Sequence, residues 1–204
     1  MTSIRDIFLD KELKTGGFYE LSIQVCQSSN NEPIQLYTKS IWSLKNVDGP
    51  FDVNFNLIPY NVENTQHNGI LQLENYSIPF MTYNIREEEL VETGFNWFDI
   101  CFYTTAIEKI FGSEYQTWTE NPKVPKLLSD FLINTVNNLH HLFPFKLAII
   151  DFEVSGQYYL NDLKENLNQS YITSKFYVGE ENFEKIANEN KKIVTKIEKR
   201  NNLL

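Results

Sequence analysis

The chain has little of what most metal and disulfide centres are built from. Among its 204 residues, two are cysteines and three are histidines. The cysteines, Cys26 and Cys101, are too few for a disulfide framework, and no CxxC pair or Cys/His cluster suggests a zinc site. Both cysteines fall in apolar stretches, so we expect them to be reduced, buried and unreactive.

Sequence motifs for phosphate binding and hydrolysis are also missing. The chain contains no GxxxxGK[ST] loop and no GxGxxG turn after a strand, which are the common nucleotide cradles. It contains neither GxSxG nor HExxH, the motifs of serine hydrolases and zinc proteases. We therefore predict no cofactor, although a nucleotide could still bind in a way that these motifs do not describe.

Long hydrophobic runs are absent. The longest, residues 147–150, has four residues, against the roughly 20 that a transmembrane helix needs. Residues 1–6 lack the basic region and apolar stretch of a secretory signal. We therefore expect a cytoplasmic protein that does not contact a membrane. The abundance of Asn, Ile and Lys is typical of an AT-rich genome and favours a bacterial or phage source.

Positive charge is scarce. Eighteen Lys and Arg stand against 27 Asp and Glu, which gives a net charge of −9. Binding to a phosphate backbone requires the opposite balance, so we expect no nucleic-acid partner. Residues 179–204 carry six basic and five acidic side chains, which leaves −10 on the first 178 residues. A partner attracted by charge would therefore be basic.

Alternating apolar and polar residues predict strands along the first half of the chain, after a short helix within residues 1–15. The expected strands are 19–25, 34–44, 51–57, 70–76 and 78–85. The 51–57 segment shows the clearest period of two, and Pro79 favours an edge or a bulge in the last strand. We predict an antiparallel meander of about five strands with one face on the core.

Helical spacing begins near residue 96. It predicts a buried helix over 96–112 and a second helix that ends before Pro144. We expect further strands at 145–154 and 171–178, and a C-terminal helix over about 180–201. The predicted fold is a single α+β domain over residues 1–204, with a mainly antiparallel sheet and about three helices packed on one side.

Two carboxylates are the main candidate for a catalytic or metal site. In an extended strand, Asp151 and Glu153 project from the same face roughly 6.6 Å apart. Such oxygen ligands could hold Mg²⁺ or Mn²⁺, with Asp99 or Glu108 as a third carboxylate. A metal-dependent hydrolase or nuclease is thus one alternative function. The lysine that completes a common nuclease pattern is missing after Glu153, and a solvated strand face is the simpler explanation of the pair.

An acidic run is the main candidate for partner binding. Glu87, Glu88, Glu89 and Glu92 repel one another, stay exposed and could steer a basic protein toward the chain. Trp118 is the candidate aromatic anchor. We expect a non-enzymatic, acidic protein-binding module, for instance a bacterial immunity protein or an inhibitor of a basic toxin. A structural or assembly accessory protein is the remaining alternative.

Overall fold

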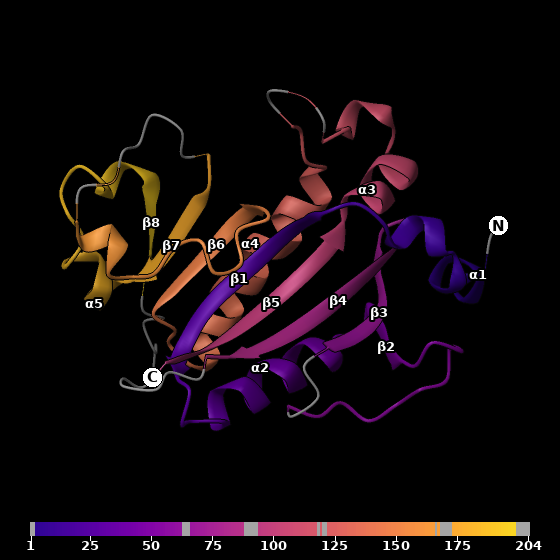
Figure 1. The fold of residues 1–204 in the computed structure, drawn as a ribbon, viewed down its shortest axis with the longest axis horizontal. Coiled ribbons are helices and arrows are strands. Elements are labelled where there is room, and N and C mark those ends of the chain that lie inside the picture. The colour runs from indigo at the N-terminus through magenta and orange to yellow at the C-terminus, as the bar shows by residue number, and fades with distance from the viewer. Residues whose placement is uncertain are drawn as a thin grey trace, which may run out of the picture.

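The computed structural model describes residues 3–62, 66–87, 94–117, 119, 122–165, 167 and 173–198. The described strands form one sheet in the order β2-β3-β4-β5-β1-β6-β7-β8 (Figure 1). They are β1 (Phe18–Gln27), β2 (Val47–Phe51), β3 (Gln66–Leu73), β4 (Tyr76–Arg86), β5 (Phe95–Tyr103), β6 (Leu147–Phe152), β7 (Lys175–Gly179) and β8 (Val194–Ile197). The β7–β8 pair is parallel, and the other neighbouring pairs are antiparallel.

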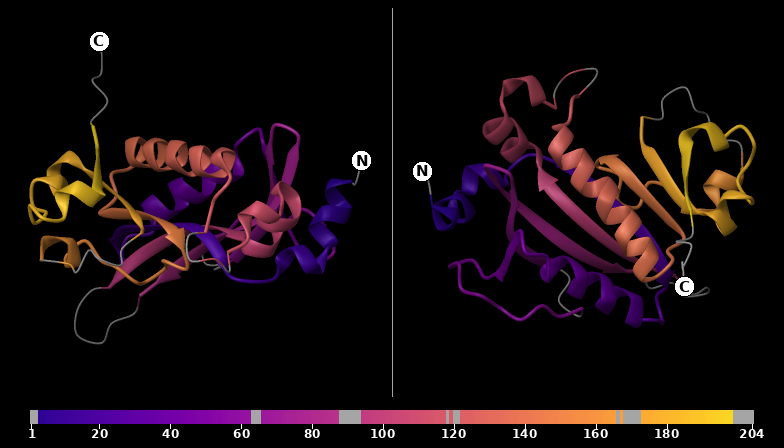
Figure 2. Two further views of the ribbon diagram at one scale, coloured as in Figure 1. Left: turned by 90° about the horizontal axis from the view of Figure 1, so that it is seen from above. Right: turned by 180° about the vertical axis from the view of Figure 1, so that it is seen from behind.

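The described residues form five α-helices, α1 (Ile4–Leu9), α2 (Glu32–Trp42), α3 (Thr104–Phe111), α4 (Lys126–Leu142) and the single turn α5 (Glu180–Phe183). Residues of α2 and α4 pack on one face of the sheet, whereas Phe8 of α1 and Phe183 of α5 belong to other apolar clusters. The helices α2 and α4 lie side by side across the same face (Figure 2). Within the described part of the chain, no helix combines the length and apolar character needed to cross a membrane. The expected α+β class, with a mainly antiparallel sheet, is confirmed.

Strand β1 shows how the two faces differ. Tyr19, Leu21, Ile23 and Val25 belong to the main core together with residues of α2 and α4. Because successive side chains of a strand point to opposite faces, the alternating residues of β1 lie on the side away from these helices. Those residues are polar and include the carboxyl of Glu20, yet they are buried as well. Something other than a helix therefore covers the second face.

The cover of the second face is the chain that follows β6. Leu147 and Ile149 of β6 form a separate apolar cluster with Val154, Leu160 and Leu163. Strand β7 and the residues after α5 add further side chains to the same cluster. Residues 153–165 thus lie over β6 and reach the polar middle of β1 and β5.

Several expected strands, and one helix, are confirmed with shifted ends. The expected strands at 19–25, 70–76, 78–85 and 145–154 correspond to β1, β3, β4 and β6, and the helix before Pro144 is α4. The expected start of the 171–178 strand lies outside the described residues, and β7 begins at Lys175. Pro79 is tolerated in an inner strand because the pairing of β4 with β5 begins only at Phe80.

The strand expected at 34–44 and the helix expected over 96–112 are wrong. Residues 34–44, expected as a strand, belong mostly to α2, whose buried residues Ile34, Tyr37, Thr38 and Ile41 recur at helical spacing. The helix expected over 96–112 is instead the central strand β5, followed by α3. Because β5 is buried on both faces, its sequence lacks the alternation that marks a half-buried strand.

The expected C-terminal helix over 180–201 is also wrong. The single turn of α5 is followed by a 3-10 turn, Lys191–Ile193, and by β8, which adds to the sheet edge beside β7. Asn190 explains the break, because it is fully buried and its side-chain amide donates to the carbonyls of Leu163 and Glu165. These bonds tie the segment to the cover of the second face. Residues 199–201 lie outside the described part of the chain.

Candidate functional site

Asp151 and Glu153, the two carboxylates predicted to act together, form hydrogen bonds on opposite sides of strand β6. Oδ2 of Asp151 accepts hydrogen bonds from the hydroxyls of Thr173 (2.8 Å) and Ser174 (2.9 Å), just before β7. Oε1 of Glu153 accepts from the backbone N–H of Phe18 (2.5 Å), at the start of β1. Because β6 lies between β1 and β7, the two carboxylates serve different sides of their strand.

Glu153 closes the end of the β1–β6 pair. It lies just beyond β6 with a left-handed backbone (φ 52°), and its carboxylate occupies the space above Gly17, where a Cβ would collide with it. Glu108, a candidate third ligand, lies on α3 and accepts a hydrogen bond from Gln116. Within the described ranges, no three or more His, Cys, Asp or Glu side chains are grouped so that they could hold a metal ion.

A buried carboxyl pair lies on the second face of the sheet. Glu20 of β1 is 3% exposed and Asp99 of β5 is 1% exposed. Ser155, on the covering chain, bonds to both: its N–H donates to Oε1 of Glu20 (2.8 Å) and its hydroxyl donates to Oδ2 of Asp99 (2.8 Å). The thiol of Cys101 donates to the other oxygen of Glu20 (3.3 Å). The cysteine is thus buried, as expected, among acidic groups.

Burial makes these carboxyls weak acids. It raises the pKa of Asp99 to about 7, and the nearby carboxyl of Glu20 acts in the same direction. Burial also raises the pKa of Glu20 itself, as well as that of the Cys101 thiol. Ser22 lies opposite Asp99 in the β1–β5 pair, but neither Ser22 Oγ nor Asp99 Oδ1 makes a well-formed hydrogen bond to a described residue. The pair can hold a proton near neutral pH and is closed to solvent.

Sequence reasoning named Asp99 only as a possible third ligand and missed Glu20 and Ser155. Glu20 alternates with apolar residues in the expected 19–25 strand, which is the pattern of a solvated face. The exposed fraction of 3% instead reflects the chain that crosses it. No local signal in the sequence places residue 155 over residues 20 and 99, so the cluster could be found only from the tertiary structure.

Glu87 is the described member of the acidic run, and it is half-buried. Its Oε1 accepts hydrogen bonds from Nε1 of Trp97 (2.8 Å) and from the hydroxyl of Tyr159 (2.7 Å). Its Oε2 accepts from the backbone N–H of Phe95 (3.0 Å). The hydrogen bonds of Glu87 therefore connect the start of β5 to Tyr159 of the covering chain. The other predicted partner-binding residues, Glu88, Glu89, Glu92 and Trp118, lie outside the described residues.

The strand expected at 51–57 is wrong, because β2 ends at Phe51 and a tight turn follows. Oδ1 of Asp52 accepts hydrogen bonds from the backbone N–H groups of Asn54 (2.9 Å) and Asn56 (2.8 Å). Its Oδ2 accepts from the side-chain amide of Asn56 (2.9 Å). Side-chain bonds of this kind compete with strand pairing and favour turns. The sequence signal was the Asp-x-Asn-x-Asn spacing.

This turn separates its four apolar residues into an inner and an outer pair. The Phe51 and Phe55 rings stack at 4.1 Å, and Phe55 also lies 5.4 Å from the ring of Phe8 in α1. Val53 and Leu57 point outward and are 86% and 72% exposed. We call these two side chains the apolar knob.

The apolar knob lies in an acidic stretch of the sequence, and Arg5 of α1 lies over the ring of Phe55, 5.7 Å from its centroid. Residues 46–85 contain four acidic residues, Asp48, Asp52, Glu63 and Glu74, and neither Lys nor Arg. The inner ring pair and the Asp52 hydrogen bonds hold the backbone of the turn that carries the knob. Comparison of the chain with protein-family models, with curated proteins and with solved structures found no match.

Proposed function

We propose that this chain is a non-catalytic protein-binding module that anchors a basic protein on the apolar knob. The observation that carries the proposal is the exposure of Val53 and Leu57, at 86% and 72%, on a turn held by side-chain hydrogen bonds. Isolated exposed apolar residues are common, but these two share one braced turn. A preorganised anchor loses little conformational freedom on binding, so more of its burial contributes to affinity.

Charge gives the chemistry of the partner. The knob lies within a 40-residue stretch, 46–85, that carries four negative and no positive side chains, on a chain of net charge −9. The negative net charge of the chain attracts a basic protein and speeds its encounter with the surface that carries the knob. Salt should slow this encounter, whereas the apolar contact itself should persist.

The arrangement of the carboxylates supports binding over hydrolysis. Asp151 and Glu153 are each engaged by bonds that join neighbouring strands. The buried pair, Glu20 and Asp99, is covered by Ser155. These carboxylates are thus engaged by hydrogen bonds within the fold. An inhibitor or immunity protein that masks a basic toxin fits this combination of an acidic surface and a rigid apolar anchor.

The proposal is tested by capture from source cells with matched variants. The tagged chain is compared with the double variant Val53→Ser/Leu57→Ser and with Leu142→Ser. Leu142, at the end of α4, is 45% exposed and serves as an apolar control outside the knob. Bound proteins are quantified by mass spectrometry at low and high salt.

We expect one protein with a net positive charge near one-to-one stoichiometry on the unmodified chain and on Leu142→Ser. The double variant should retain at least about tenfold less of this protein. Truncating a central anchor residue costs more than about 1 kcal/mol of binding free energy, and the variant truncates two. Equal retention by all three chains contradicts the proposal. So does the absence of any stoichiometric partner, or a partner that is acidic.

A further inference from the structure

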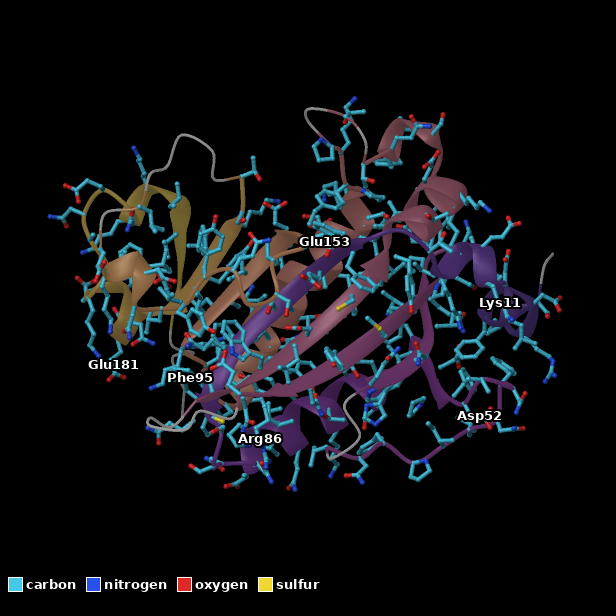
Figure 3. All side chains as sticks on the ribbon, in the orientation of Figure 1. Lys11, Asp52, Arg86, Phe95, Glu153 and Glu181 are labelled. Carbon is cyan, nitrogen blue, oxygen red and sulfur yellow. The ribbon has the colours of Figure 1, made fainter. Side chains whose placement is uncertain are left out.

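We propose that a cavity on the second face of the sheet binds a small phosphorylated organic molecule. The cavity measures about 580 Å³ and lies where the 159–164 segment, the end of β1 and the residues after α5 meet. This volume falls within the usual range of small-molecule sites. In Figure 3, the labelled Phe95, which lines the cavity, lies far from Asp52 beside the apolar knob, so the two sites are separate.

Three lysines from separate segments line this cavity. Lys146 precedes β6, Lys164 ends a 3-10 turn and Lys185 follows α5. None of the three forms an ion pair with a described residue. Asp162 is the one carboxylate among the lining residues, and its Oδ2 accepts a hydrogen bond from the N–H of Tyr159 (2.7 Å). The cavity wall therefore carries a net charge of about +2 on a chain that is acidic as a whole.

The side-chain amide of Gln24 adds a hydrogen-bonding group to the cavity wall. Gln24 lines the cavity and is 2% exposed. Its Oε1 accepts a hydrogen bond from the N–H of Leu160 (3.0 Å), whereas its Nε2 makes no hydrogen bond to any described residue. This bond fixes the side chain at the cavity wall, where its Nε2 can donate to a ligand oxygen. Phosphate oxygens are strong acceptors for such a donor.

Aromatic rings supply a surface for the organic part. Phe95 and Tyr159 line the cavity, with ring centroids 6.5 Å apart and planes tilted by 55°. The ring of Tyr159 is fixed by its hydroxyl bond to Glu87 and by an edge contact with Trp97. A phosphate monoester carries a charge of about −1.5 to −2 at pH 7, which balances the lysines and Asp162. The cavity thus matches a phosphate joined to a planar or apolar group.

No sequence motif could have indicated this site. Lys146, Lys164 and Lys185 are spread over 40 positions, and Gln24 lies more than 100 positions before them. They come together only because the 159–164 segment, the region of α5 and the end of β1 line one cavity. Figure 1 shows α5 beside β7 and β8, at one end of the sheet. The recognised phosphate loops depend instead on contiguous glycines, so their absence does not bear on a site assembled from side chains.

The test is isothermal titration of the full chain with adenosine monophosphate, glucose 6-phosphate, inorganic phosphate and adenosine. The double variant Lys146→Gln/Lys185→Gln removes two positive charges from the cavity. The control Lys39→Gln/Lys45→Gln removes the same charge from α2 and the residues after it. Melting curves verify that both variants fold.

We expect at least one phosphate ester to bind and the cavity variant to weaken it at least tenfold, with the control within twofold of the unmodified chain. The ester should bind with higher affinity than inorganic phosphate. The substitution Phe95→Leu should reduce this difference in affinity. Adenosine monophosphate, which has a planar base, should bind more tightly than glucose 6-phosphate; the reverse preference contradicts the assignment of the aromatic rings to the organic group. The proposal is overturned if neither ester binds, if inorganic phosphate or adenosine binds as well as the esters, or if the control weakens binding equally.

Discussion

Ser155 and Asp99 lie 56 positions apart, and the hydroxyl of Ser155 donates a 2.8 Å hydrogen bond to Oδ2 of Asp99. The N–H of the same serine donates to Glu20. One residue of the covering chain therefore bonds to both buried carboxyls on adjacent strands. These bonds explain how acidic side chains are accommodated on a buried sheet face, and they make the stability of the fold depend on pH.

Asp99→Asn should stabilise the protein at pH 8. The pKa of Asp99 is about 7 in the folded chain, against 3.8 for an ordinary aspartate. A raised folded-state pKa means that stability is full below pH 3.8 and falls as pH rises to about 7. This one group accounts for a decrease of at most about 4 kcal/mol. Urea unfolding from pH 4 to pH 8 measures the free energy of unfolding of the variant and of the unmodified chain. The advantage of the variant should grow with pH; a difference that stays constant contradicts the raised pKa of Asp99.

Ser155→Ala should destabilise the fold more at pH 8 than at pH 5. The lost hydroxyl bonds to a carboxyl that is ionised only at the higher pH, where a hydrogen bond to a charged group contributes about 1.5–3 kcal/mol. Repeating the substitution in the Asp99→Asn background provides the control. In that background the cost should be independent of pH, and persistence of the pH dependence would assign it to another group.

The sequence predicts elements well where one face is apolar and the other is polar. Strand β1 and helix α4 each carry an apolar stripe of the right period, and both were expected. Strand β5 is covered on both sides, so its run of large apolar residues matched a helix equally well. The C-terminal segment has apolar residues at helical intervals, but packing of Ile186 and Val194 under β6 and β7 determines its path. Pairing partners cannot be read from periodicity.

The candidate sites were less predictable than the fold. Val53 and Leu57 were assigned to a strand because, together with Phe51 and Phe55, they alternate with polar residues. In the turn the four apolar residues do not share one face: the two phenylalanine rings stack inward, and Val53 and Leu57 are exposed. The polar side chains of Asp52 and its neighbours redirect the backbone. Burial of Glu20 and convergence of the lysines depend on long-range contacts that no local pattern encodes.

The apolar knob should be dispensable for folding, unlike the ring pair beneath it. Val53→Ser and Leu57→Ser should each change the free energy of unfolding by less than about 0.5 kcal/mol, because both residues are largely exposed. Phe55→Ala should cost about 1–3 kcal/mol, since its ring stacks on Phe51 and contacts Phe8. Urea unfolding measures all three. A large loss of stability in either serine variant would mean that the knob is part of the core.

Asn190→Ala should loosen the C-terminal edge of the sheet. The substitution leaves the carbonyls of Leu163 and Glu165 without their amide donor, at a cost of about 1–3 kcal/mol. Hydrogen exchange should show faster labelling of β8 than in Lys192→Ala, an exposed control in the same segment. Unchanged protection of β8 would show that Asn190 does not hold this segment in place.

Site-specific photo-crosslinking tests the proposed anchor most directly. A photoreactive amino acid is placed at position 57 in one chain and at position 142 in another, each is expressed in source cells, and crosslinked proteins are identified by mass spectrometry. We predict that position 57 yields one predominant basic protein that position 142 does not yield. The same proteins from both positions, or none from position 57, would contradict the assignment of the apolar knob as a binding anchor.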